Sequence, residues 1–199
     1  MFSGWQTKTR SMTIPNILTL LRVAIIPIVV VLLIAGESDA TQWWAFYLFV
    51  ASAMTDFFDG WLARKLNQES DIGRLFDPIA DKFLIAAVYL VLVDADIIAG
   101  WNVLAVILIL GRELLVSALR AYLAERGIAM PSSKHAKYKT AVQLASAALL
   151  IISPLFDPLF AQVALIALWL AAALTVSSGY GYWMRSSEHF TAHANKAGE

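Results

Sequence analysis

The sequence predicts an all-α integral membrane protein with six transmembrane helices and with both termini on the cytoplasmic side. Three observations lead to this fold class: the composition, the lengths of the apolar stretches, and the distribution of charge between them. Hydrophobic residues make up 59% of the 199 residues and charged residues 15%, whereas soluble domains contain about 45–50% and about 25% respectively. The chain has no cysteine, which excludes a disulfide framework and a thiolate metal site.

Six apolar stretches account for most of the chain. They lie at residues 14–35, 43–66, 75–93, 101–123, 139–155 and 160–184. Each is close to the roughly 20 residues that a transmembrane helix needs, and the alternation of a membrane barrel is absent. The first is expected to be a retained span, because its exit "LIAGESDA" is a poor signal-peptide cleavage site. We therefore expect one transmembrane domain over residues 1–185 and a polar, flexible C-terminal tail over 186–199.

Charge is segregated between alternate connections. The first, third and fifth connections, at residues 36–42, 94–100 and 153–158, contain Asp or Glu but no Lys or Arg. Basic residues gather at the two chain ends, near the second and fourth connections, and within the fourth stretch. Because cytoplasmic loops of membrane proteins are enriched in Lys and Arg, this pattern places both termini in the cytoplasm. An even number of spans agrees with that placement.

Aspartates gather where the second stretch ends and the third begins, in "TDFFDGWLARKLNQESDIGRLFDPIADK" at residues 55–82. Asp56 and Asp59 are three residues apart and Asp77 and Asp81 are four apart, so on helices each pair shares a face. Single aspartates at helix ends are usually solvated caps. Ionisable groups in apolar helices are costly, however, and two pairs at helical spacing predict a functional cluster.

Four converging carboxylates require cations, and hard divalent ions such as Mg²⁺ or Mn²⁺ suit oxygen ligands. Two such ions are typical of phosphoryl-type chemistry. Small residues accompany the aspartates: Gly60 and Ala63 follow the first pair, and Gly73 precedes the second. They leave space in which a flat or bulky group can approach the backbone. Arg64 provides a planar fork for a phosphate.

A second polar set interrupts the fourth stretch and the start of the fifth. Its basic members are Arg112, Arg120, Lys137 and Lys139. Cations near an acidic metal site predict a pocket for an anionic substrate that carries a phosphate, which would be the acceptor in the phosphoryl-type transfer. The alternative is anchoring at the membrane surface, which is favoured for Lys134 and Arg126. Glu113 is adjacent to Arg112, does not share its helical face, and is expected to pair elsewhere.

The acidic motif resembles the signature of the CDP-alcohol phosphotransferase family. It runs Asp56-x-x-Asp59-Gly60-x-x-Ala63-Arg64, then eight residues, then Gly73-x-x-x-Asp77-x-x-x-Asp81, and it matches at every motif position. The resemblance implies a six-helix membrane enzyme that joins a CDP-linked donor to an alcohol and releases CMP. It also implies divalent metal on the four aspartates and a homodimer.

Three further segments resemble the phosphatidylglycerophosphate synthase branch of that family. They are "IPNILTLLR" at 14–22, "RELLVSALR" at 112–120 and "KYKTAVQ" at 137–143, so the resemblance covers residues 13–185. It implies CDP-diacylglycerol as donor and sn-glycerol 3-phosphate as acceptor, and serine or inositol phosphate stays open as the acceptor. The expected location is the bacterial inner membrane, among membrane lipids, with the site facing the cytoplasm and with no nucleic-acid partner.

The resemblance also suggests roles for the motif residues. The donor nucleotide is expected at Asp56, Gly60, Ala63, Arg64 and Gly73. Asp81, besides binding metal, is expected to accept the proton of the acceptor hydroxyl as general base. One displacement or two successive ones stay open. The rival from another class is a cation transporter, although such sites usually lie at the membrane midplane between repeats. A purely structural membrane protein leaves the aspartates unexplained.

Overall fold

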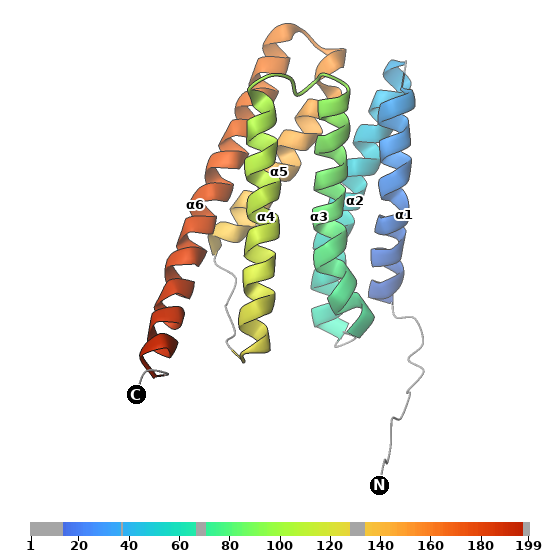
Figure 1. Cartoon of the computed structure of the whole chain (residues 1–199). Helices are drawn as coiled ribbons and strands as arrows, with labels where there is room; N and C mark the ends of the chain where they lie inside the picture. Colours follow the sequence, from blue (N-terminus) through green and yellow to red (C-terminus); the bar gives the residue numbers. More distant parts are fainter. Residues whose placement is uncertain (1–13, 37, 67–70, 128–133, 197–199) are drawn as a thin grey trace.

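The computed structural model consists of six α-helices and one short 3-10 helix, with no strand, in the backbone that it describes, residues 14–36, 38–66, 71–127 and 134–196 (Figure 1). Side chains are described for residues 20–36, 38–55, 79–80, 82–127 and 138–184. The helices are α1 (Ile14–Ala35), α2 (Asp39–Leu66), α3 (Asp71–Asp94), α4 (Asn102–Glu125), α5 (Lys134–Ile152), η1 (Ser153–Leu155) and α6 (Pro158–Lys196). The all-α prediction is confirmed.

Capping residues explain where two helices begin. Helix α2 starts four residues before the predicted stretch, because the Ser38 hydroxyl accepts a hydrogen bond from the Thr41 amide at 3.4 Å and Asp39 lies in the first turn. Helix α6 starts at Pro158, and the Asp157 carboxylate accepts from the Phe160 amide at 2.9 Å.

Helix α6 does not end at the boundary predicted after residue 185. Its backbone continues to Lys196 and includes most of the segment that was expected to form a separate tail. Residues 186–196 contain neither proline nor glycine, so the sequence gives the helix no reason to stop at the polar boundary. Polarity therefore marks the end of the apolar stretch rather than the end of the helix.

The helices run alternately up and down, so the start of α1 and the end of α6 lie at the same end of the bundle (Figure 1). The end of α2, the start of α3 and the end of α4 lie at that end too. Helix α5 packs on α2, α3 and α6, while α1 packs on α2 and α3 and α4 packs on α6. The acidic helices α2 and α3 therefore meet the basic ones through α5 and through a smaller contact between α3 and α4.

A continuous apolar core joins the helices, and large apolar side chains also cover the outside. Phe49, Val88 and Leu168 are among the fully buried residues, whereas Leu114 on α4 and Ile166 on α6 are 70% and 67% exposed. Among the described residues, three segments are long and apolar enough to cross a membrane, Asn102–Glu125, Tyr138–Leu155 and Pro158–Met184, and Leu20–Ala35 is a shorter apolar helix. Such a surface fits lipid surroundings.

Candidate functional site

The four predicted metal-binding aspartates belong to two consecutive antiparallel helices (Figure 1). Asp56 and Asp59 lie ten and seven residues before the end of α2, and Asp77 and Asp81 lie six and ten residues after the start of α3. At about 1.5 Å per residue, Asp56 and Asp81 share one depth, roughly 15 Å from the junction. Asp59 and Asp77 share a shallower depth of roughly 10 Å. The backbone therefore brings the aspartate positions into two levels.

The orientation of these side chains lies outside the described part of the structure. The same holds for the side chains predicted to contact the donor and for one predicted acceptor residue, which are Gly60, Ala63, Arg64, Gly73 and Lys137. Among the described side chains, no group of three or more His, Asp or Glu residues lies close enough together to hold a metal ion. Since none of the four aspartates is in that set, metal binding and the base role of Asp81 stay predictions.

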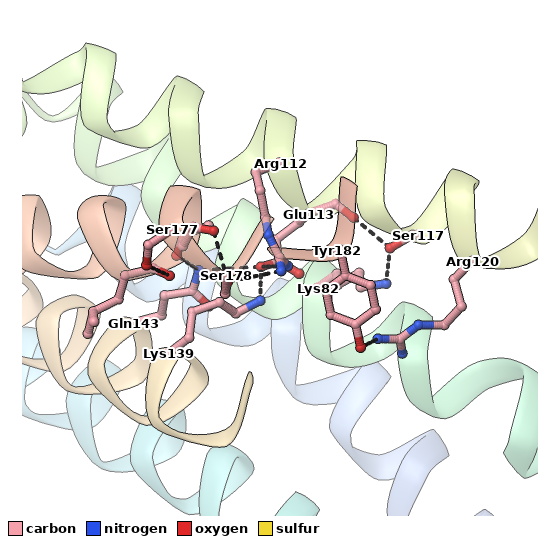
Figure 2. Close-up of polar contacts among 12 residues, drawn as sticks. Lys82, Arg112, Glu113, Ser117, Arg120, Lys139, Gln143, Ser177, Ser178 and Tyr182 are labelled. Carbon is pink, nitrogen blue, oxygen red and sulfur yellow. Dashed lines mark hydrogen bonds and ion pairs between the residues drawn. The ribbon is translucent and has the colours of Figure 1, made fainter. Parts of the chain in front are cut away.

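A polar network among α4, α5 and α6 has Glu113 at its centre (Figure 2). Its carboxylate Oε1 accepts hydrogen bonds from Lys139 Nζ, from Arg112 Nη1 at 3.5 Å and from Gln143 Nε2 at 3.5 Å. The side chains of Lys139, Arg112 and Glu113 are only 6%, 10% and 15% exposed. Glu113 therefore pairs with a cation from another helix, as expected, and also with its neighbour Arg112, which its position on α4 did not predict.

Helix α6 completes the network from the other side. Gln143 donates to the Thr175 hydroxyl at 2.8 Å, and Arg112 Nη2 donates to the Ser178 hydroxyl at 2.9 Å. The ring of Tyr182 lies beside the guanidinium groups of Arg112 and Arg120, whose carbons are 5.9 and 5.3 Å from its centroid. Arg120 Nη2 also donates to the Tyr182 hydroxyl at 2.8 Å. These contacts hold both arginines against one helix.

Two further contacts join helix α3 to this network. Lys82, the residue after Asp81, donates from Nζ to the Ser117 hydroxyl on α4, and Ser117 donates to the backbone oxygen of Glu113 at 2.5 Å (Figure 2). Deeper in the bundle, the Tyr89 hydroxyl donates to the backbone oxygen of Gln143 at 3.1 Å. The helix that carries the second aspartate pair is thereby tied to the basic helices.

Three of the four predicted acceptor residues, Arg112, Arg120 and Lys139, meet in this network. Residues that the sequence analysis did not select also belong to it: Lys82, Ser117, Gln143, Thr175, Ser178 and Tyr182. A signal for the last three was present, because "TVSSGYGY" at 175–182 is a polar run within an apolar stretch. The contact between Lys82 and Ser117 carries no such signal, since the two residues are 35 positions apart in the sequence.

The network has the electrostatics of an anion site. Its described side chains on α4, α5 and α6 include three cations, Arg112, Arg120 and Lys139, and one carboxylate, Glu113. Buried charges are costly unless they are paired, and the carboxylate offsets only part of the positive charge. An incoming phosphate would receive charge-assisted hydrogen bonds from such a set.

An apolar groove lies between α2 and α5, beside the acidic motif. It has a volume of about 430 Å³ and is lined by four residues of α2 between Phe49 and Met54 and by four of α5 between Ala141 and Ala148. Its lining side chains are all apolar. Met54 precedes Asp56 by two residues, which is about 3 Å along a helix. The groove can therefore receive a hydrocarbon chain whose head lies at the motif.

Comparison with known families agrees with the motif. The sequence model of the CDP-alcohol phosphatidyltransferase family matches residues 12–177, which is most of the chain and includes all four aspartates. The chain belongs to the CDP-alcohol phosphatidyltransferase family. This assignment confirms the resemblance that the acidic motif predicted.

Several members of this phosphatidyltransferase family are similar over nearly their whole length. A protein of Rickettsia typhi is 38% identical over 179 residues, covering 89% of this chain and 98% of that protein. Proteins of Bacillus subtilis and Pseudomonas fluorescens are 35% and 34% identical, covering 88% and 93% of this chain and 95% of each of those proteins. All three are named CDP-diacylglycerol–glycerol-3-phosphate 3-phosphatidyltransferase.

Proposed function

We propose that this phosphatidyltransferase moves the phosphatidyl group of CDP-diacylglycerol to sn-glycerol 3-phosphate and yields phosphatidylglycerophosphate and CMP. The observation that carries the choice of acceptor is the meeting of Arg112, Arg120 and Lys139 in one network, tied through Lys82 to the helix of Asp77 and Asp81. Three cations favour an acceptor with a phosphate over an acceptor such as serine. The names of the similar proteins favour glycerol 3-phosphate over inositol phosphate.

The acidic positions fit a divalent metal by their donor chemistry. Four carboxylates at two matched depths on α2 and α3 would hold two Mg²⁺ or Mn²⁺ ions, through Asp56, Asp59, Asp77 and Asp81. When bound, the ions supply positive charge against the diphosphate and the departing CMP.

The residues of the chain then have the following roles. Gly60, Ala63 and Gly73 leave room for the nucleotide beside the backbone, and Arg64 binds a donor phosphate. Asp81 accepts the proton of the acceptor hydroxyl. The deprotonated oxygen of the acceptor attacks the phosphorus that stays with the diacylglycerol, on the side opposite the departing CMP. The cations of α4 and α5, with Lys137 among them, hold the acceptor phosphate.

The groove between α2 and α5 supports a lipid donor. A diacylglycerol chain that lies between Phe49 and Ala148 would be held there by van der Waals contacts with the apolar lining. Its head would then lie at the cytoplasmic end of α2, where Asp56 follows the groove residues.

The membrane arrangement is part of the proposal. All six helices span the inner membrane of a bacterium, and the end that holds both termini faces the cytoplasm, as the distribution of Lys and Arg predicts. A homodimer follows from the family resemblance. Donor and acceptor then meet at the inner leaflet, where the lipid head and a soluble phosphate ester are both accessible.

The decisive experiment uses purified protein, radiolabelled CDP-diacylglycerol and a panel of alcohols with and without Mg²⁺ or Mn²⁺. CMP release that requires both glycerol 3-phosphate and the divalent ion is expected. Preference for serine or inositol phosphate would overturn the acceptor but not the reaction class. Cation uptake into reconstituted vesicles without CMP release would indicate the transporter instead. Stereochemistry at phosphorus separates one displacement from two.

A further inference from the structure

The side chain of Arg112 passes over a glycine of α6. A Cβ atom built on Gly179 would lie 2.9 Å from Arg112 Cγ, 3.1 Å from its Nε and 3.6 Å from its Cδ. Contacts below 3.0 Å do not persist between carbon atoms, and Cγ is too close to the backbone of α4 to swing away freely. The path that Arg112 takes therefore exists because residue 179 has no side chain.

Two neighbours of Gly179 hold the end of the same side chain. Ser178 accepts from Arg112 Nη2 at 2.9 Å, and the Tyr182 ring lies 5.9 Å from the guanidinium carbon (Figure 2). Ser178 is itself fixed, because its hydroxyl donates to the backbone oxygen of Thr175 at 2.9 Å. Ser178, Gly179 and Tyr182, which we name the α6 slot, thus contact the stem and the head of Arg112.

The slot accounts for a direction that helix geometry alone does not give. Arg112 and Glu113 are consecutive on α4, so their side chains leave the helix about 100° apart. Arg112 Nη1 nevertheless lies 3.5 Å from the carboxylate that also receives Lys139. Because the slot holds the Arg112 side chain along α6, the guanidinium of Arg112 lies near the other cations of the network.

We propose that the α6 slot positions Arg112 for the acceptor phosphate, and that Gly179 is the specific residue on which this depends. The inference rests on the proposed function for the identity of the anion. Gly179 touches no substrate in this proposal and acts through Arg112. Displacing the guanidinium would weaken the grip on the acceptor while leaving the donor site and the chemical step intact.

The test compares Gly179→Ala with Gly181→Ala, a control on the same helix whose added Cβ would have no atom within 4 Å. Both changes favour the helix itself, because alanine is the better helix former. For Gly179→Ala we expect the KM for glycerol 3-phosphate to rise roughly tenfold, as for a displaced charge-assisted hydrogen bond. The kcat and the KM for CDP-diacylglycerol should stay at wild-type values, and Gly181→Ala should change none of these constants.

Ser178→Ala provides a second variant should Gly179→Ala fail to fold. It removes the acceptor of Arg112 Nη2 together with the local bond from that hydroxyl to Thr175, and is expected to raise the same KM severalfold. Unchanged KM for glycerol 3-phosphate in both variants, or an equal rise in Gly181→Ala, would overturn the slot. Melting temperatures in detergent with increasing glycerol 3-phosphate report acceptor binding without turnover. If glycerol 3-phosphate stabilises the wild-type protein but no CMP is released, the proposed reaction is refuted. The slot is then tested by comparing the shift in melting temperature between the wild type and the variants.

Discussion

The acidic end of α2 and α3 and the basic network of α4, α5 and α6 are built in opposite ways. The four aspartates lie within 26 consecutive positions, from Asp56 to Asp81, on two helices joined by a short connection. The basic network joins Lys82 to Tyr182 across four helices, through contacts between residues as much as 66 positions apart. The first region depends on the spacing of residues along the sequence, and the second depends on the packing of helices against one another.

The two regions should be vulnerable to different substitutions. A site made by spacing keeps its geometry as long as its two helices form, so a substitution there should change chemistry more than stability. A site made by packing depends on buried pairs between helices, so a substitution there should change stability and binding together.

Asp81→Asn should lower kcat by about 10²–10⁴-fold, because the amide cannot accept the hydroxyl proton. Folding and most nucleotide binding should persist, since the two side chains have nearly the same shape. CMP release and nucleotide affinity are the measurements. Asp157→Asn at the other end of the bundle is the control, because asparagine caps a helix as well as aspartate does. Full activity in Asp81→Asn would refute the assignment of the base.

Glu113→Ala should cost about 3–5 kcal/mol of stability, because it leaves Lys139 and Arg112 buried without their carboxylate. Thermal unfolding in detergent measures the loss. Glu113→Gln keeps an oxygen that can accept from Lys139 and should lose less. If the alanine variant melts like the wild type, the network is not held together by Glu113, and the contrast between the two regions fails.

Lys139→Met should raise the KM for glycerol 3-phosphate roughly tenfold or more, in keeping with the loss of a hydrogen bond to a charged group. Lys134→Met at the start of the same helix is the matched control. It is expected to leave that KM unchanged, because Lys134 was assigned to anchoring at the membrane surface. Equal effects from the two lysines would mean that both act through general surface charge.

Tyr182→Phe should have the smallest effect, a loss of about 1 kcal/mol for the hydrogen bond from Arg120, with a rise of severalfold in the KM for glycerol 3-phosphate. Trp169→Phe removes a bond of similar kind, from its Nε1 to Asn102 at 3.0 Å, away from the network. We expect a comparable loss of stability there without a change in KM. If the KM for glycerol 3-phosphate rises in both variants, the network is not specifically responsible for binding the acceptor.

The sequence was sufficient for the fold class and for the acidic motif. Apolar stretches of transmembrane length gave the helices, because burial in lipid and the need to satisfy every backbone group depend only on local composition. The aspartate spacing predicts its cluster from equally local information, since positions three and four apart share a helical face whatever surrounds them. Helix ends were less well predicted, as at Ser38, where a cap decides the start of α2, and in α6, which continues past the polar boundary.

Packing between helices determines which basic residues meet and what orients them. The sequence suggested Arg112, Arg120 and Lys139 as a set, but not that Glu113 lies between two of them. Nor did it suggest that α6 carries the slot for Arg112. The physical reason is that pairing between helices depends on which faces are packed together. The absence of a Cβ atom at Gly179 matters only because the side chain of Arg112, from another helix, occupies that space.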